Sequence, residues 1–329
     1  MVIRSRKITM HLVQNESEVK VYQAALAGAA AGAFTRAVAQ PLDVLKIRFQ
    51  LQIEPLGKGS KYSSISQAVG SIVKEEGVST LWSGHVPAQL LSISYGVLQF
   101  SAFETLTDLC QKTDTHFYVN NKPWINFSNG AIAATVATVA SFPFDTVRTR
   151  LIAEQKTHKA YKGFIDAFST MVKYEGASSL FKGLIPTLGQ IAPHAGVQFA
   201  TYKILTDGIL NKVPFFQREL NLGSAVETTL FANLVAGSVA GFIAKTTIYP
   251  FDLVKKRMQI QGFQQYRQGF GKQMYCNGLL DCVKLTITEE GFQALFKGYW
   301  PSMLKAVLVS ALHFAVYDEI KHILVRVQR

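Results

Sequence analysis

Three isolated cations are the residues of this chain best suited to binding chemistry. Arg36, Lys245 and Lys305 each interrupt an otherwise uncharged stretch of sequence. A cation at the centre of a membrane-spanning helix costs about 2.5–3.5 kcal/mol on insertion scales, and facing a water-filled cavity avoids much of that cost. Three such cations suit a diphosphate or a larger anion. They therefore predict an anion-binding site, with snorkelling of the side chains to the membrane surface as the alternative.

Polar side chains recur at four-residue spacing on two of the apolar stretches. One stretch carries Tyr95 and Gln99 on the same face as Leu91, and the other carries Gln190 and His194. Residues four apart share one face of a helix. We expect these faces to line a polar pathway in which Tyr95 faces a flat or cationic ring. Hydrogen bonding between helices is the alternative interpretation.

The stretches that carry these residues are long enough to cross a membrane. Charged residues make up 17% of the chain, against roughly 25% in an ordinary soluble domain, and the net charge is +12. Such an apolar composition excludes intrinsic disorder, and three cysteines without a C-x-x-C pair exclude a disulfide framework. The predicted fold is an all-α membrane protein with six transmembrane helices, at residues 21–42, 84–103, 123–144, 183–202, 228–251 and 298–317.

Positive charge is unequally divided between the connections of these helices. Residues 46–83, 148–182 and 255–297 hold 19 Lys plus Arg, whereas residues 105–123 and 203–227 hold 5. One side of the membrane is therefore much more basic than the other. An even number of spans places both termini on the same side.

The chain also repeats itself three times. A proline, an acid and two bases recur at fixed spacing, and a Glu-Gly pair with a later aromatic residue and glycine follows each time. The first pattern is Pro41-x-Asp43-x-x-Lys46-x-Arg48, Pro143-x-Asp145-x-x-Arg148-x-Arg150 and Pro250-x-Asp252-x-x-Lys255-x-Arg257; the second is Glu76-Gly77 with Trp82-Ser83-Gly84, Glu175-Gly176 with Phe181-Lys182-Gly183, and Glu290-Gly291 with Phe296-Lys297-Gly298. The predicted division is an N-terminal tail at 1–20 and repeats at 21–110, 123–210 and 228–322.

The tripled motifs resemble those of the mitochondrial carrier family over residues 21–322, with Ser83 where the family usually has Lys or Arg. The resemblance implies three repeats related by a pseudo-threefold axis, each with a short amphipathic helix on the matrix side. It also implies a monomer in the mitochondrial inner membrane with both termini on the intermembrane-space side. Within the family, segments 46–52, 84–89 with 94–96, and 249–257 resemble thiamine pyrophosphate carriers.

The resemblance further implies a gate of ion pairs on the matrix side. Each acid of the first motif would meet the base of another repeat, and a glutamine one turn after the base would brace the pair. The motif prolines are expected to end or kink their helices. Three unrelated charges beside the membrane are the alternative interpretation. The expected pairs are Asp43–Arg148, Asp145–Lys255 and Asp252–Lys46, with Gln50 and Gln259 as braces and Ile152 in place of a third.

A second gate, on the cytoplasmic side, is predicted to be weaker. The family pattern there is an aromatic residue, an acid and a base, and only Tyr317-Asp318-x-x-Lys321 is complete. Glu104 is followed by Thr107 where a base would stand. We therefore expect this gate to stabilise its closed state less than the matrix gate does.

Glycines and lysines at the start of later helices are predicted lipid contacts. Gly84, Lys182-Gly183 and Lys297-Gly298 precede apolar helices, whose first free N–H groups attract phosphate. By family likeness these are cardiolipin sites. Simple capping with snorkelling of the lysines is the alternative interpretation.

The resemblance implies transport of a phosphorylated small molecule, with Leu91, Gln190 and Lys305 as central contacts. The first hypothesis is exchange of thiamine pyrophosphate, a transported substrate rather than a cofactor, against a nucleotide by alternating access. The second is transport of coenzyme A or an adenine nucleotide. No G-x-G-x-x-G, Walker, H-E-x-x-H or G-x-S-x-G motif is present, so we expect no enzyme, metal or nucleic-acid partner. A non-transporting adaptor is the remaining alternative.

Overall fold

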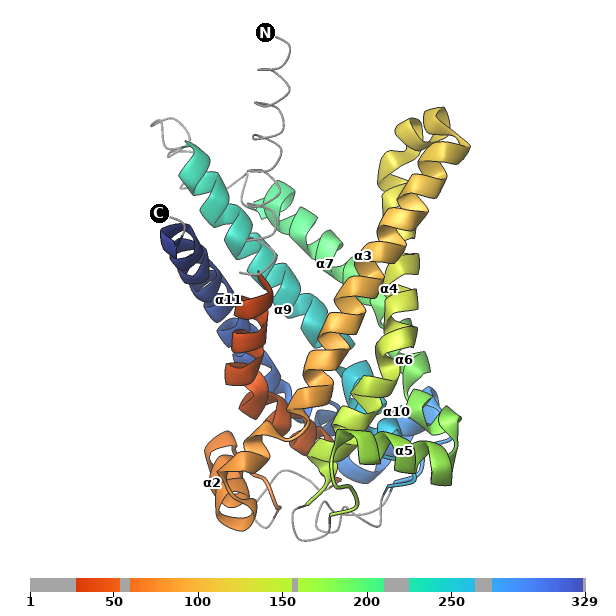
Figure 1. The fold of residues 1–329 in the computed structure, drawn as a ribbon, viewed down its shortest axis with the longest axis vertical. Helices are drawn as coiled ribbons and strands as arrows, with labels where there is room; N and C mark the ends of the chain where they lie inside the picture. Colours follow the sequence, from red (N-terminus) through yellow and green to blue (C-terminus); the bar gives the residue numbers. More distant parts are fainter. Residues whose placement is uncertain (1–27, 54–59, 156–158, 210–224, 264–273, 328–329) are drawn as a thin grey trace, which may run out of the picture. The chain divides into compact units, whose positions relative to one another are not determined.

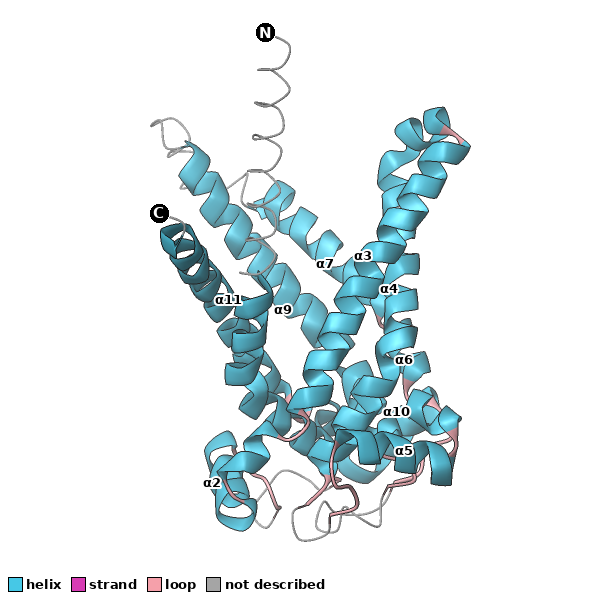
Figure 2. Cartoon of the chain, viewed as in Figure 1, coloured by secondary structure: helices cyan, strands magenta, loops and turns pink. Residues whose placement is uncertain are grey.

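The computed structural model describes residues 28–53, 60–155, 159–209, 225–263 and 274–327 (Figure 1). Within these ranges the chain forms helices joined by short loops (Figure 2). The all-α prediction therefore holds for the described residues. The predicted N-terminal tail, residues 1–20, lies outside them.

The chain divides into two compact units. The described part of the first comprises residues 28–44 and 300–327, and the second runs from residue 45 to residue 299. The helix formed by residues 28–51 begins in the first unit and ends in the second.

Long helices occupy the predicted spans. Within the second unit α3 packs along α4, and α7 packs along α9. Asp114 separates α3 from α4 and caps the latter, because its carboxylate accepts the Phe117 N–H at 2.9 Å. The long helices after residues 28–51 are α3 (His85–Thr113), α4 (Thr115–Ala153), α6 (Leu184–Gly189) with α7 (Ile191–Lys203), α9 (Ala225–Gln259) and α11 (Tyr299–Val327).

The fourth predicted span is broken in two. α6 ends at Gly189 and α7 begins at Ile191, with Gln190 between them. Pro193 lacks the N–H that would bond the carbonyl of Gly189 four residues earlier. The break places Gln190, a predicted substrate contact, at the junction of two short helices.

The motif prolines lie inside helices rather than at their ends. Pro143 lies within α4 and Pro250 within α9, and helix 28–51 continues past Pro41. These prolines therefore do not end their helices, and the alternative expectation, that they kink them, stays a prediction. A proline inside a helix costs roughly 3 kcal/mol. The ion pairs formed by Asp145 and Asp252 just after it offset part of that cost.

Three helices of 12 residues each follow the motif helices: α2 (Ile65–Glu76), α5 (Phe164–Glu175) and α10 (Leu279–Glu290). Each is followed, after one glycine, by a short 3-10 helix: η1 (Val78–Trp82), η3 (Ala177–Phe181) and η7 (Phe292–Phe296). In α2 the buried residues are Ala68, Ile72 and Glu76, which share one face at four-residue spacing. These helices are therefore amphipathic elements lying against the unit.

Among the described helices, α4 is the one that combines the length and the apolar composition needed to cross a membrane. The other long helices contain many small and hydroxyl-bearing residues. One example is the segment Ala236-Gly-Ser-Val-Ala-Gly241 of α9. Such residues lower the mean hydropathy and let helices approach one another closely.

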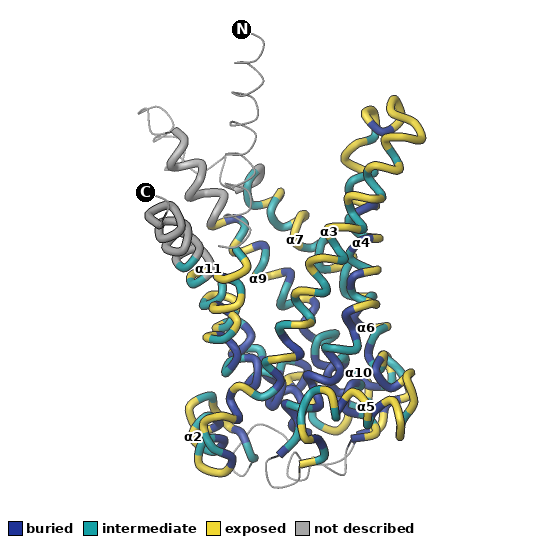
Figure 3. The backbone as a smooth tube through the Cα atoms, viewed as in Figure 1, coloured by how far each residue is buried: buried dark blue, intermediate teal, exposed yellow. Residues whose placement is uncertain are grey.

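Burial in the second unit is concentrated at one end. The residues after the motif prolines are largely buried, whereas the far ends of α3 and α4 are largely exposed (Figure 3). Arg48 and Arg150 are among the largest fully buried side chains. A buried charge is costly unless it is paired and hydrogen-bonded. We therefore expect these arginines to belong to a network of ion pairs and hydrogen bonds at this end of the unit.

Candidate functional site

Asp145 of the predicted matrix gate is bonded by three side chains of α9. It lies in α4, one turn or less after Pro143, and is buried. Lys255 of α9 approaches its carboxylate at 2.8 Å, and the Gln259 side-chain amide donates to it at 2.9 Å. The structure thus brings together the acid, the base and the glutamine whose grouping the family resemblance implied.

Lys256, which the sequence interpretation missed, belongs to the same cluster. Its ammonium donates at 2.9 Å to Asp145 Oδ1, Thr149 Oγ1 and Gln259 Oε1. The side chain is 10% exposed, so its three N–H donors are satisfied almost entirely by protein. In the motif Lys256 occupies the variable position between the two bases, and the spacing gave no signal for it.

Asp252 binds both a predicted gate base and a predicted substrate cation. Lys46 lies 3.2 Å from its carboxylate, and Lys245 pairs with the same oxygen. Lys245 and Asp252 lie seven residues apart on α9, which is about two helical turns. The predicted substrate cation of this helix is therefore in direct contact with a carboxylate of the predicted gate.

The first unit contains a corresponding pair. Lys305 donates to both carboxylate oxygens of Asp43, at 2.6 and 2.8 Å. Arg36 is exposed on helix 28–51. The remaining expected pair, Asp43 with Arg148, would join the two units and stays a prediction.

Gln50 contacts the Lys46–Asp252 pair only through an intermediate side chain. Its amide donates at 3.2 Å to the hydroxyl of Tyr249, and the ring of Tyr249 lies 5.9 Å from the ammonium of Lys46. Gln259, by contrast, bonds the Asp145 carboxylate itself. The two glutamines therefore support neighbouring ion pairs in different ways.

The predicted polar face of α3 lies toward α4. Leu91, Tyr95 and Gln99 are half-buried, and the Tyr95 hydroxyl lies within interaction range of Thr138 of α4. Thr138 stands five residues before the motif proline of the second repeat. Arg36 and Lys245 stand at the same distance before the motif prolines of the first and third repeats. The hydroxyl of Tyr95 therefore lies beside Thr138, which occupies the position that Arg36 and Lys245 occupy in the other two repeats.

Gln190, at the junction of α6 and α7, and His194 of α7 are the predicted contacts of the fourth span. Gln190 presents a buried Oε1 that has no hydrogen-bond partner among the described residues. His194 interacts electrostatically with both Lys245 and Asp252. The structure therefore groups His194 with the Lys245–Asp252 pair.

The second base of each motif forms bonds that the sequence interpretation did not assign. The pairs are Arg48–Glu76, Arg150–Glu175 and Arg257–Glu290. Each guanidinium also donates to two main-chain oxygens at the end of another motif helix. Both partners of every pair stand in the repeated motifs, so the signal was present. The oxygens are those of Ile152 and Glu154 for Arg48, Gln259 and Gln261 for Arg150, and Gln50 and Gln52 for Arg257.

Two lysines predicted to bind lipid extend this network. Lys182 donates to the carbonyl of Gln261 at 2.8 Å and lies 3.5 Å from Glu175. Lys297 donates to the carbonyl of Gln52 at 2.9 Å and pairs with Glu290. The side chain of Lys182 is 36% exposed and that of Lys297 is 2% exposed. Both ammonium groups therefore bond protein, and their role toward lipid stays a prediction.

Two carboxylates outside the predicted spans have pKa values shifted in opposite directions. Burial would raise the pKa of Glu175, but the hydrogen bond and charge of Arg150, with Lys182, hold it below its usual value. Burial raises the pKa of Glu154, although N–H groups of Tyr161 and Ala160 oppose the shift. The stability of the two environments must therefore respond to pH with opposite sign.

The glycines that open the later helices touch the gate bases. All three have positive φ, at +70° for Gly84, +87° for Gly183 and +78° for Gly298. Only glycine adopts this backbone region without cost. An added Cβ at each glycine would also lie close to the main-chain oxygen of a predicted gate base. The distances are 3.1 Å from Gly84 to Arg148, 2.9 Å from Gly183 to Lys255 and 2.6 Å from Gly298 to Lys46.

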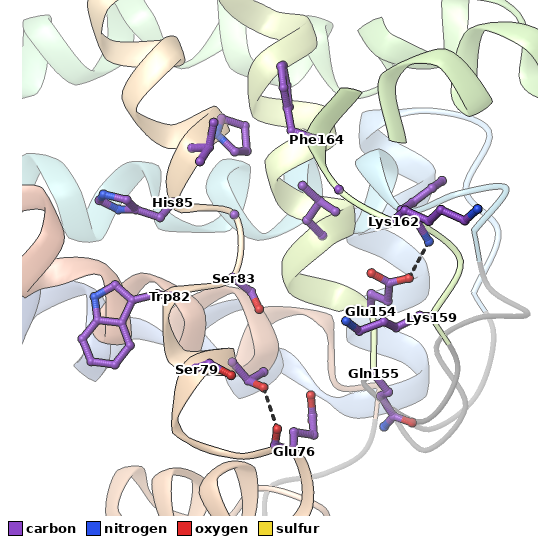
Figure 4. Close-up of a pocket in the computed structure, with 17 residues that line it drawn as sticks. Glu76, Ser79, Trp82, Ser83, His85, Glu154, Gln155, Lys159, Lys162 and Phe164 are labelled. Atoms are coloured by element: carbon purple, nitrogen blue, oxygen red, sulfur yellow. Dashed lines mark hydrogen bonds between the residues drawn. The ribbon is translucent and has the colours of Figure 1, made fainter. Parts of the chain in front are cut away.

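A cavity of about 360 Å³ lies beside the start of α3 in the second unit (Figure 4). Glu76, Ser83 and Glu154 line it, together with Lys159 and Lys162. Glu154 accepts the N–H of Tyr161 at 2.8 Å. Groups of both charges therefore face one space that is large enough for a small polar ligand.

The predicted cytoplasmic gate is only partly visible. Glu104 is exposed on α3. The side chains of Tyr317, Asp318 and Lys321 lie outside the described residues. The relative strength of the two gates stays a prediction.

Comparison with known proteins identifies the family. A family model described as "Mitochondrial carrier protein" matches residues 17–114, 119–213 and 226–328. The chain is 42% identical over 307 residues to the "Mitochondrial thiamine pyrophosphate carrier" of Bos taurus, covering 92% of this chain and 93% of the relative. The protein of that name from Homo sapiens is 41% identical over 300 residues, covering 90% of each. The "Mitochondrial thiamine diphosphate carrier 2" of Zea mays is 35% identical over 312 residues, covering 90% of this chain and 92% of the relative. The chain therefore belongs to the mitochondrial carrier family.

Proposed function

We propose that the chain exchanges thiamine pyrophosphate against a nucleotide across the mitochondrial inner membrane by alternating access. Relatives that are 41–42% identical over 90–92% of the chain and are named as thiamine pyrophosphate carriers support this substrate. The family and the names of these relatives favour transport over enzymatic catalysis. Thiamine pyrophosphate is then the transported solute and not a cofactor.

The observation that carries the mechanism is the contact between candidate substrate cations and gate carboxylates. Lys245 binds Asp252 in the second unit, and Lys305 binds Asp43 in the first. A diphosphate that binds the ammonium of Lys245 or Lys305 removes an ion-pair partner from the carboxylate of Asp252 or Asp43. Substrate binding and gate opening are thereby coupled, because both compete for the same lysines.

The ion pairs of the proposed gate have an intermediate strength, so they can stabilise the closed state and still be broken when substrate binds. An exposed ion pair contributes about 0–1 kcal/mol, whereas removing one partner of a buried pair costs roughly 3–5 kcal/mol. The side chains of Lys46 and Asp252 are 15% and 13% exposed, between these limits. When Lys245 turns to the substrate, Lys46 still holds Asp252, so the gate weakens in steps.

The membrane architecture is part of the proposal. Six spans form three repeats, at 21–110, 123–210 and 228–322, in a monomer whose termini face the intermembrane space. The helices within the predicted spans support this arrangement, as does the threefold recurrence of the Arg–Glu pairs. The helices α2, α5 and α10 then lie at the matrix surface, where cardiolipin binds near Gly84 and its equivalents.

Counterflow in liposomes tests the substrate. Full-length chain is reconstituted with internal thiamine pyrophosphate, and uptake of labelled thiamine pyrophosphate is measured with and without nucleotide on the other side. We expect saturable uptake that nucleotide can drive. Uptake of coenzyme A or adenine nucleotides without thiamine pyrophosphate would select the second transport hypothesis. Folded protein that takes up none of these solutes would instead be an adaptor.

Substitutions test the site. Arg36→Ala and Lys305→Ala should abolish uptake, because each removes a cation that meets the diphosphate, and Tyr95→Ala should reduce uptake less severely. Lys284→Ala is the control, since Lys284 is exposed on α10, and it should retain the wild-type rate. Wild-type rates in all variants at equal folded abundance would refute the site.

A further inference from the structure

The third repeat departs from the other two at a pair of buried positions. In the first two repeats a tyrosine stands fourteen residues before the motif glutamate, an alanine stands eight residues before it, and both are buried. These pairs are Tyr62 with Ala68 and Tyr161 with Ala167, and the corresponding pair of the third repeat is Cys276 with Cys282. Two thiols therefore occupy the positions at which the other repeats have an aromatic ring and a methyl group.

The tyrosines bind the second base of the motif, whereas the third repeat binds this base in another way. The hydroxyls of Tyr62 and Tyr161 accept hydrogen bonds from the motif arginines of their repeats, at 3.2 and 3.5 Å. Arg257 donates instead to the hydroxyl of Thr286, within α10, at 2.9 Å. The guanidinium of this repeat thus has an acceptor on α10 itself, and a tyrosine in place of Cys276 is not needed to bind it.

The two cysteines lie together in one apolar cluster. Cys276 and Cys282 pack with Ile53, Val254 and Met274, and their thiols are within interaction range of each other. Cys276 lies in the loop that enters α10, and Cys282 lies near the start of that helix. Neighbouring thiols have the chemistry to form a disulfide, and here only a short loop and the first residues of α10 separate them.

The two thiols differ in exposure and in acidity. Cys276 is 7% exposed and Cys282 is 0% exposed, so a small oxidant in solution meets Cys276 first. Interaction with the Cys282 thiol lowers the pKa of Cys276, and the charge of Arg257 acts in the same direction. Interaction with Cys276, together with burial, raises the pKa of Cys282. Because the thiolate is the reactive form of cysteine, Cys276 is the attacking group of the pair.

We propose that Cys276 and Cys282 are a site of oxidative modification, at which hydrogen peroxide converts the two thiols to an intramolecular disulfide. The Cys276 thiolate attacks one peroxide oxygen, the O–O bond breaks, and the departing oxygen takes a proton and leaves as water. Cys282 then loses its proton, and its sulfur attacks the sulfur of the Cys276 sulfenic acid and expels a second water. Two thiols are oxidised to one disulfide, and one peroxide is reduced to two waters.

The bond is expected to be reversible. Disulfides of proteins in reducing compartments are usually transient, and a dithiol reductant opens such a bond by exchange. The inference does not depend on which solute the carrier transports.

Peptide mass spectrometry tests the bond. Folded full-length chain in detergent is treated with hydrogen peroxide, remaining thiols are alkylated after denaturation, and the peptides are analysed without reduction. We expect Cys276 and Cys282 in one product that is two hydrogens lighter than the reduced pair, with no cross-link to Cys110. Dithiothreitol should restore both thiols. Recovery of both thiols unchanged, at a dose that oxidises glutathione in the same sample, would overturn the proposal.

Variants establish the order of the two steps. Cys282→Ala introduces the residue that Ala68 and Ala167 provide in the other repeats, and it should leave Cys276 trapped as a sulfenic acid that dimedone labels. Cys276→Ser removes the attacking thiol and should leave Cys282 unlabelled. Cys110→Ser is the matched control and should form the disulfide as the wild type does. Equal dimedone labelling in Cys282→Ala and Cys276→Ser would overturn the order of attack, and loss of the disulfide in Cys110→Ser would overturn the pairing.

Discussion

Lys256 joins α9 to α4 by hydrogen bonds beyond the single acid–base pair that the repeated motif provides. Two of its three hydrogen bonds go to α4, at Asp145 and Thr149. Any opening between these helices must break both of them, in addition to the pair formed by Lys255. We infer that this is the most firmly closed junction of the matrix gate within the second unit.

Replacement of Lys256 by methionine should therefore lower stability. The change leaves Asp145 with Lys255 and Gln259, so the loss should be about 2–3 kcal/mol, below the full cost of an unpaired buried charge. Thermal unfolding measures it, with Lys284→Met as the exposed control. A melting temperature equal to that of the control would contradict this role of Lys256.

Acid should act on Glu175 and Glu154 with opposite sign. The pKa of Glu175 lies below 4.5 in the folded state, so its contribution to stability is present above about pH 4.5 and is lost as the pH falls. The pKa of Glu154 lies above 4.5, so its contribution is lost as the pH rises through that range. Melting temperatures measured between roughly pH 3 and pH 6 should fall less steeply in Glu175→Gln and more steeply in Glu154→Gln than in the wild type. Parallel curves for the three proteins would refute this assignment.

The residues that could be predicted from sequence are those that repeat in register. Asp145 and Lys255 belong to a tripled pattern, and their pairing follows once helices of different repeats adjoin. Lys256 has no counterpart at the same motif position, and only the three-dimensional placement of Thr149 and Gln259 gives it a role. Gln190 was predicted as a contact, but the helix break around it depends on Pro193 and on packing that spacing does not reveal.

Helix starts and gate helices meet through glycine. At Gly183 the backbone has φ of +87°, and a Cβ would lie 2.9 Å from the carbonyl of Lys255. The start of α6 can approach α9 this closely only without a side chain. The same relation holds at Gly84 and Gly298 with their own gate bases. These glycines set how tightly the network at this end of the second unit can close.

Gly183→Ala should therefore destabilise the closed state. The left-handed backbone costs a non-glycine residue about 1–2 kcal/mol, and the clash with the Lys255 carbonyl adds to it. Gly130→Ala in α4 is the control, because a Cβ there meets nothing within 4 Å and alanine favours a helix. Thermal unfolding should separate the two variants by several degrees. A Gly183→Ala protein as stable as Gly130→Ala would show that this close approach is not needed.

Across the whole molecule, the cations proposed to bind the substrate also pair with aspartates of the proposed gate. Lys245 and Lys305 each hold a motif aspartate, one in each unit. An anion must compete with these carboxylates, so part of its binding energy is used to release them. In the proposed mechanism, the transporter would therefore respond to its substrate without a separate sensor.

Asp252→Asn should tighten thiamine pyrophosphate binding while weakening closure. The change frees Lys245 from competition, and an interaction of about 1 kcal/mol corresponds to an approximately fivefold lower Kd. Calorimetric titration measures the affinity, and Asp108→Asn is the control because Asp108 is exposed on α3. Weaker or unchanged binding in Asp252→Asn would mean that Lys245 and the substrate do not compete.

The interruption at Gln190 has a mechanical consequence. A continuous rod transmits a displacement from one end to the other, whereas two short rods joined at one residue can tilt by different amounts. Spin labels on α6 and on α7, each measured against a label on α9, should therefore report unequal distance changes when the carrier turns over.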